Sequence, residues 1–364
     1  MPKATTRARV LAPEPLGFGD VRRLVQASLT AGVSVLLRGH PGVGKSAMAA
    51  GIARSMGLPL IDIRLAQRDP AELAGVYFPN RETSALELFP PGWVRQAVDA
   101  PALVFLDEIN AGVTRLHQAA AYQIVLERRV GPFAFHPQTV VMAAGNLATD
   151  QAIVTTLSSA LCNRFAHFTL DVDPESWLAW GADHDIDPRI LAYIGRHGAK
   201  ALYQQTGKHA FPSPRSWALA SQVLRHADER DTRRVLTALV GIEAAERFVA
   251  YLRIYERVNA KAIVLKGKAM DFTKGKHAEP SFVYAAVFSV AAWLTQEAEA
   301  RDLPDAAIDN VTRFLRSKGL DPEYWLLFLR QIKSRRDLLG RLKQRPEFQE
   351  LAAGMVDLHA GLYA

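Results

Sequence analysis

The stretch GHPGVGKS, residues 39–46, determines how the surrounding chain is expected to fold. An apolar run containing β-branched residues, 33–37, precedes it, and a run of good helix formers, 47–56, follows it. This order of strand, glycine-rich loop and helix is the context in which G-x-x-x-x-G-K-S binds phosphate. Gly42 and Gly44 let backbone N–H groups converge on a phosphate, and the start of the helix adds unpaired donors. The motif therefore predicts a nucleotide site in an α/β fold.

Each residue of this loop has an expected role. Lys45 would reach the β- and γ-phosphates of ATP as a point charge, and the Ser46 hydroxyl would ligate Mg²⁺. The simpler interpretation is a strand-to-helix turn with a solvated lysine, so a second motif is needed to decide. The predicted nucleotide-binding residues are Gly39, His40, Pro41, Gly42, Val43, Gly44, Lys45, Ser46 and Ala47.

A second motif, ALVFLDEIN, occupies residues 102–110. Its apolar run predicts a buried strand that ends in two adjacent carboxylates. Asp107, at the tip of the strand, would hold Mg²⁺, and Glu108 would orient and deprotonate the water that attacks the γ-phosphate. Acidic residues also end strands as ordinary turn formers. After a phosphate-binding loop, however, the pair indicates a site for nucleotide hydrolysis.

Composition limits the broad class of the protein. The chain has 364 residues, of which 49% are hydrophobic and 22% charged, which is typical of an ordered globular protein with two or three domains. The net charge of +7 permits contact with nucleic acid or an acidic partner but requires neither. The single cysteine, Cys162, excludes an intramolecular disulfide and a cysteine-based zinc site.

Two stretches of the sequence bear on the cellular compartment. The first ten residues are basic and polar, without the apolar core of a secretory signal. The longest apolar run, residues 282–294, is too short for a membrane span and predicts a buried helix. Together with the single cysteine, these features predict a cytoplasmic protein with no membrane partner.

The order of elements predicts a parallel sheet sandwiched by helices. Predicted strands at residues 60–63, 102–106, 139–144 and 166–170 alternate with helices, the first of which is expected to be capped by Asp20. Gly39, Asp107 and Asn146 all follow strands, and ligands bind at the carboxyl ends of parallel strands. Less regular structure is expected in an N-terminal arm (1–16), an insertion of exposed loops (64–92) and a short hairpin (129–137).

After residue 173 the strand signals stop and only helices are expected. The predicted domains are an α/β nucleotide-binding domain (1–172), an α-helical lid (173–258) and a C-terminal helical extension (259–364). A basic cluster near the C-terminus could bind an acidic protein or nucleic acid, although solvation alone would explain it. Its members are Lys333, Arg335, Arg336, Arg341, Lys343 and Arg345.

The motifs together resemble those of a known family. GHPGVGKS, FLDEIN, AAGN, LSSALCNRF and SPRS occur in this order over residues 17–257, an arrangement similar to that of the AAA+ ATPases and, within them, the MoxR group. The resemblance implies the P-loop AAA+ fold and Mg²⁺-dependent ATP hydrolysis. It also implies assembly into a ring of identical chains, expected to be a hexamer, which remodels or activates other proteins.

The resemblance also implies roles for three further residues. Asn146 matches sensor 1, which helps to place the attacking water. Arg164 matches the arginine finger, which acts on the nucleotide of a neighbouring subunit. Arg215 matches sensor 2, and the local sequence agrees because Ser213 is a good N-cap and Pro214 suits the first helical position. With Glu108, these residues make up the predicted catalytic set.

Partners follow from the same resemblance. Residues 66–92 and the hairpin 129–137 match inserts that face the ring pore and contact a client or adaptor protein, such as one carrying a von Willebrand factor A domain. Two alternatives remain open. One is a nucleic-acid motor or loader of the helicase or transposition type. The other is a small-molecule kinase on the same loop, against which the adjacent Asp107 and Glu108 count.

Overall fold

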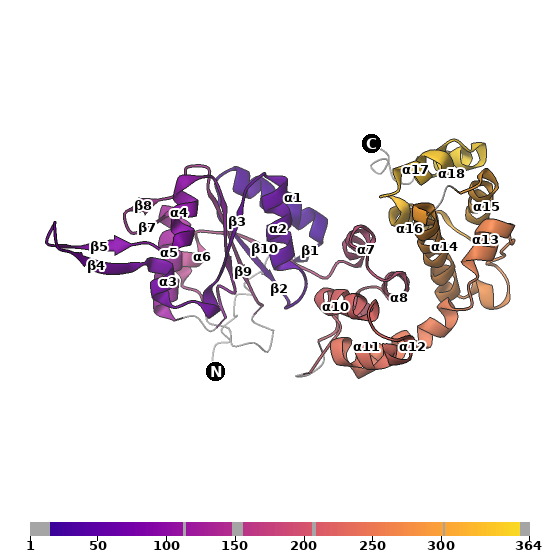
Figure 1. The fold of residues 1–364 in the computed structure, drawn as a ribbon, viewed down its shortest axis with the longest axis horizontal. Coiled ribbons are helices and arrows are strands. Elements are labelled where there is room, and N and C mark those ends of the chain that lie inside the picture. Colours follow the sequence, from indigo (N-terminus) through magenta and orange to yellow (C-terminus); the bar gives the residue numbers. More distant parts are fainter. Residues whose placement is uncertain (1–14, 112–113, 148–155, 206–208, 301–302, 357–364) are drawn as a thin grey trace, which may run out of the picture. The chain divides into compact units, whose positions relative to one another are not determined.

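The computed structural model describes residues 15–111, 114–147, 156–205, 209–300 and 303–356. The chain divides into two compact units, Met1–Val172 and Asp173–Ala364 (Figure 1). The first unit contains a parallel sheet with helices on both faces, and the described part of the second is built of helices. The predicted α/β fold with a helical C-terminal region is therefore confirmed.

The sheet of the first unit has six parallel strands. Their spatial order is β1 (Pro15–Leu16), β10 (Ala166–Leu170), β2 (Val35–Gly39), β9 (Val140–Gly145), β6 (Leu103–Asp107) and β3 (Leu60–Arg64). Strands β6 and β9 are buried along their whole length, as their continuous apolar sequences predict for strands covered on both faces. The phosphate-binding loop, Asp107 and Asn146 all lie at the carboxyl ends of the three neighbouring strands β2, β6 and β9.

Helices cover both faces of this sheet. Helices α1 (Phe18–Thr30) and α2 (Lys45–Ser55) lie on one face, and α4 (Gly92–Asp99) and α5 (Arg115–Glu127) lie on the other (Figure 1). The shorter helices of this unit are η1 (Leu65–Gln67), α3 (Pro70–Ala74) and α6 (Ser159–Cys162). Apolar side chains of α4 and α5 form one core with the strands they cover.

The N-terminal arm (1–16) was predicted to have little structure of its own; of its described residues, Pro15 and Leu16 pair with β10 as an edge strand, and residues 1–14 lie outside the described part. Two other local predictions about this unit were wrong. Asp20 does not cap the first helix, because α1 already begins at Phe18. The insertion at 64–92 is ordered, since it contains α3 and an antiparallel hairpin.

That hairpin consists of β4 (Val76–Asn80) and β5 (Ala85–Phe89). Nearly all of its side chains are exposed, so its sequence does not show the alternation of apolar and polar residues that identifies a half-buried strand. A second hairpin, β7 (Arg129–Val130) and β8 (Phe133–Ala134), lies within residues 129–137 as predicted.

The second unit consists of helices in its described part. They are α7 (Pro174–Asp183), α8 (Pro188–His197), α9 (Ala199–Leu202), α10 (Pro214–Leu224), η2 (Glu229–Asp231), α11 (Thr232–Val240), α12 (Ile242–Tyr255), α13 (Ala260–Lys266), η3 (Gly275–Ala278), α14 (Pro280–Ala300), α15 (Asp305–Leu315), α16 (Pro322–Ile332), α17 (Arg336–Lys343) and α18 (Pro346–Val356). Helix α14 packs against α8, α12, α13 and α16. It therefore joins the predicted lid to the predicted extension, and a division at residue 258 remains a prediction.

Helix α14 contains the longest apolar run of the sequence. Phe288, Val290 and Leu294 are almost fully buried, so this run forms a buried helix of the second unit, as predicted. None of the helices within the described residues combines the length and the apolar character needed to cross a bilayer.

Candidate functional site

The loop between β2 and α2 has the backbone that its glycines allow. Gly42 and Gly44 have φ angles of 80° and 107°, in the left-handed region that other residues rarely adopt. A Cβ atom at Gly39 would lie 2.9 Å from the carbonyl oxygen of Leu170 in the neighbouring strand. Helix α2 begins at Lys45, so its first N–H groups face the loop. This arrangement suits the binding of phosphate.

Lys45 lies inside this loop and is only 9% exposed. Its Nζ atom donates hydrogen bonds to the carbonyl oxygens of Gly39 (2.7 Å) and His40 (3.0 Å). It also donates to Oδ1 of Asn146, at 3.0 Å, across more than a hundred residues of sequence. The structure therefore brings the predicted phosphate-binding lysine together with the predicted sensor 1.

Ser46 and Asp107, the two predicted metal ligands, are in direct contact. The Ser46 hydroxyl donates to Oδ2 of Asp107 at 2.8 Å, and Oδ1 of Asp107 accepts from the backbone N–H of Glu108 at 2.9 Å. A hydroxyl beside a carboxylate is a set of hard oxygen donors, which fits Mg²⁺ held in part by substrate phosphates. Within the described residues, no cluster of three or more histidine, cysteine or acidic side chains suggests another metal site.

The negative charge of Asp107 also affects a neighbouring strand. Burial raises the pKa of Asp62 on β3, the charge of Asp107 raises it further, and Arg64 opposes both effects. Arg64 pairs in register with Asp107, and Asp62 with Phe105 two residues earlier. Asp62, Arg64 and the predicted metal ligand Asp107 therefore lie on one face of the sheet.

Glu108 has a backbone conformation that is uncommon for its residue type. Its φ angle is 56°, and its carbonyl oxygen accepts from the N–H of Ala111 at 3.0 Å, so the chain turns sharply after β6. Unusual backbone angles of this kind cluster at functional sites. No side chain of the described residues binds the Glu108 carboxylate. The carboxylate is therefore available to orient a water molecule.

Sequence reasoning missed one residue of this site, Asn110. Its Nδ2 donates to the carbonyl oxygen of Asn146 at 2.8 Å, and its Oδ1 accepts from the N–H of Asn146 at 3.0 Å. The side chain is only 7% exposed. In the sequence, Asn110 is visible only as a polar residue two positions after Glu108. That position alone does not indicate that Asn110 binds Asn146.

Arg164 lies apart from these contacts. It follows α6, its N–H donates to the carbonyl oxygen of Leu161 at 3.1 Å, and its side chain is exposed. Gln118 of α5 holds the segment before α6, since it donates to the carbonyl oxygen of Thr156 and accepts from the N–H of Ser158. No ion pair joins Arg164 to any described carboxylate. Its guanidinium group is therefore presented to solvent, and its predicted role in a neighbouring subunit remains untested.

Arg215 belongs to the second unit. The predicted local structure is present, because Ser213 caps α10 by accepting from the N–H of Ser216 at 3.1 Å and Pro214 occupies the first helical position. Arg215 is exposed in the first turn of this helix. Its predicted action on the nucleotide remains a prediction.

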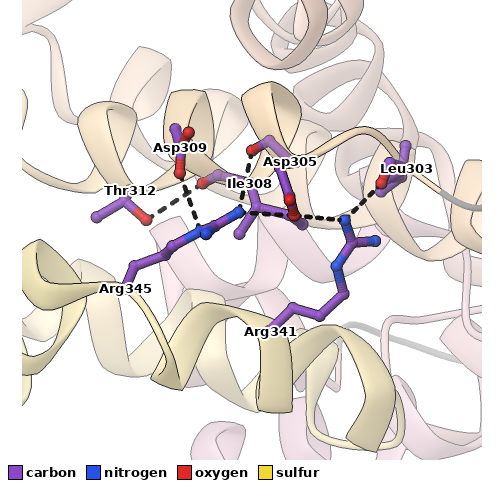
Figure 2. A network of polar contacts seen from close by, with 7 residues as sticks. All are labelled: Leu303, Asp305, Ile308, Asp309, Thr312, Arg341 and Arg345. Carbon is purple, nitrogen blue, oxygen red and sulfur yellow. Dashed lines mark hydrogen bonds and ion pairs between the residues drawn. The ribbon is translucent and has the colours of Figure 1, made fainter.

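Three arginines of the C-terminal basic cluster are engaged within the chain. Arg341 donates to the carbonyl oxygen of Leu303 and pairs with Asp305 at 3.1 Å, while Arg345 pairs with Asp305 and Asp309 at 2.7 and 2.9 Å (Figure 2). Arg335 donates to the carbonyl oxygen of Thr295 at 3.1 Å. These three arginines attach α17 and its flanking residues to α14 and α15. The cluster therefore offers a partner fewer free charges than its sequence suggested.

Comparison with known protein families gives a match within the first unit. Residues 35–170 match the ATPase family associated with various cellular activities (AAA). The match extends from the start of β2 to the end of β10, so it contains the loop, Asp107, Glu108, Asn146 and Arg164. Residues 35–170 form an AAA ATPase domain. The chain is accordingly an enzyme that hydrolyses ATP.

Solved structures resemble most of this chain, but at low sequence identity. A candidate ATPase from Cytophaga hutchinsonii has 16% identity over 90% of this chain and 89% of its own, with a TM-score of 0.34. A RuvB point mutant from Thermotoga maritima has 15% identity over 83% and 92%, with a TM-score of 0.38. NtrX from Brucella abortus has 14% identity over 92% and 69%, with a TM-score of 0.39. Similarity of this size does not bear on function. No curated protein sequence gives a significant match.

Proposed function

We propose that this protein is a Mg²⁺-dependent, MoxR-like ring ATPase that remodels or activates a partner protein. The observation that carries the catalytic part is the contact network of Lys45 with Asn146 and of Ser46 with Asp107. It unites segments that are separate in the sequence at the carboxyl edge of one sheet. Ring assembly and a partner protein are supported by the family resemblance.

The residues of the site have complementary roles in hydrolysis. Mg²⁺, when bound beside Ser46 and Asp107, would neutralise charge on the phosphate oxygens. Glu108 would orient the attacking water and accept its proton, while the side-chain amide of Asn146 would hold the same water or the γ-phosphate. Lys45 already donates to three protein oxygens, so phosphate must replace at least one of them.

Exposed apolar side chains on the β4–β5 hairpin support contact with a protein. Tyr77 is 61% exposed and Leu86 67% exposed, and Phe78 packs edge-on against Phe89 with 5.4 Å between ring centroids. A two-stranded hairpin cannot bury both of its faces by itself. Apolar patches of this kind mark sites of protein interaction. We propose that this hairpin contacts the client.

Removal of the Lys45 ammonium group tests the nucleotide site. We expect Lys45→Ala to weaken ATP binding about 10- to 100-fold, because a charged hydrogen bond to phosphate contributes roughly 1.5–3 kcal/mol. Titration with a fluorescent ATP analogue measures the dissociation constant. Lys261→Ala, which removes an exposed lysine of α13, is the control and should bind like the unmodified protein. Unchanged binding by Lys45→Ala would refute the proposed site.

Assays of the unmodified protein distinguish the alternative functions. Release of phosphate in the absence of any acceptor argues against a small-molecule kinase. Stimulation of hydrolysis by duplex DNA, decreasing steeply with salt, would instead favour a nucleic-acid motor. Capture of a specific protein by an ATP-bound ring, lost when Tyr77 and Phe78 are replaced by serine, would support the proposed client contact.

A further inference from the structure

The turn after β6 and the loop after β9 remain paired beyond the end of their strands. The last residues of the two strands that pair in register are Leu106 and Ala143. Beyond them, the N–H of Ile109 still donates to the carbonyl oxygen of Ala144 at 2.9 Å. The side chain of Asn110 then forms two hydrogen bonds with the backbone of Asn146. A carboxamide thus takes the place of a peptide group and extends the pairing of the strands.

This extension orients the side chain of Asn146. The backbone N–H and carbonyl of Asn146 are both bound by Asn110, and its Oδ1 accepts from Lys45. Because an ammonium group only donates hydrogen bonds, the atom facing Lys45 must be the amide oxygen. The Nδ2 donor of Asn146 therefore points away from Lys45 and can serve a phosphate oxygen or the attacking water.

We propose that Asn110 is a positioning residue for ATP hydrolysis, holding Asn146 in a defined place relative to Glu108. Asn110 and Glu108 belong to the same turn, so the contact with Asn146 links the general base to sensor 1. This inference rests on the proposed roles of Glu108 and Asn146. Asn110 itself acts through Asn146 and need not touch the nucleotide.

The chemistry at this position requires asparagine. Aspartate at position 110 would still accept from the N–H of Asn146. Its second carboxylate oxygen, however, would face the carbonyl oxygen of Asn146, where Nδ2 of Asn110 now donates. Leucine has a similar shape and removes both hydrogen bonds. Glycine at position 145 is also required, because a Cβ atom there would lie 2.8 Å from Oδ1 of Asn110. Gly145→Ala therefore displaces the carboxamide without removing any polar group.

Steady-state kinetics of Asn110→Leu and Gly145→Ala test this role. We expect kcat to decrease about 10- to 100-fold in both variants, since misplacement of a catalytic group by about 1 Å has an effect of this size. The dissociation constant for ATP should change less than about threefold, because Lys45 and the loop are unaltered. A split between kcat and binding would not result from a loss of stability alone.

Thr139 provides a matched structural control at the opposite end of β9. It is 5% exposed, accepts from the N–H of Ala102 and donates to the carbonyl oxygen of Ala97, both at 3.2 Å. Thr139→Val removes these two bonds and should lower the melting temperature while leaving kcat unchanged at temperatures well below melting. If Asn110→Leu behaves like Thr139→Val, the role of Asn110 is structural and the proposal is wrong.

A double-mutant cycle separates this proposal from the proposed function. If Asn110 acts through Asn146, adding Asn110→Leu to Asn146→Ala should lower kcat no further. Additive effects of the two substitutions would overturn the positioning role. If Glu108→Gln retains full turnover, the assigned chemistry fails instead, whatever Asn110→Leu does. The two failures are therefore distinguishable.

Discussion

Replacement of Glu108 by glutamine is expected to lower ATP turnover about 100- to 10,000-fold while ATP binding is retained. Glutamine keeps the size of the side chain but cannot accept a proton from water. The carboxylate of Glu108 forms no hydrogen bond or ion pair with the side chains of the described residues, so its replacement should leave the site intact. Lys45, Ser46 and Asp107 keep their hydrogen bonds in this variant, which preserves the affinity for nucleotide.

Single-turnover measurement with excess protein gives the rate of hydrolysis without interference from product release. The dissociation constant for a fluorescent ATP analogue should agree with that of the unmodified protein within about threefold. Glu127→Gln, an exposed change at the end of α5, is the control and should hydrolyse ATP normally. Retained turnover in Glu108→Gln would exclude this residue as the base. The same variant, held in its ATP-bound form, is suited to capturing the client.

Sequence patterns predicted the central sheet well, for a physical reason. Strands β6 and β9 are covered by helices on both faces, so each consists of a continuous apolar run that is visible without the structure. The loop 39–46 predicted α2, because its glycines and the lysine at the helix start have a local geometric role. Asp107 and Asn146 could be placed at one edge because all strands of an alternating α/β sheet point the same way.

Contacts between distant segments could not be read from the sequence. The bond from Asn110 to Asn146 depends on β6 and β9 being neighbours, although α5 and a hairpin separate them along the chain. Likewise, Arg341 and Arg345 formed part of a basic run in the sequence, yet they pair with acidic residues of α15. In both cases the partner is set by tertiary packing, which local composition does not encode.

Removal of the Arg164 guanidinium group is expected to lower hydrolysis about 1,000-fold or more, if this group acts on the nucleotide of a neighbouring subunit. Arg164 is exposed and has no ion pair with described carboxylates, so Arg164→Ala should not destabilise the first unit. Arg22→Ala, an exposed change on α1, is the control. It should retain normal turnover.

A mixing experiment decides whether Arg164 acts between subunits. Arg164→Ala keeps an intact phosphate loop and Glu108, whereas Lys45→Ala keeps Arg164 but binds ATP weakly and lacks the ammonium group at the phosphates. Neither variant alone should hydrolyse ATP at a useful rate. Wherever a Lys45→Ala subunit presents Arg164 to an Arg164→Ala neighbour, one complete site is formed, so the mixture should be far more active than the sum of its parts.

The outcome of mixing has a direct structural meaning. If mixing restores no activity although the two variants assemble together, Arg164 does not complete a neighbour's site. Restored activity would mean that the catalytic unit is a pair of chains, because the contacts within one chain unite Lys45 with Asn146 and Ser46 with Asp107 but do not include Arg164.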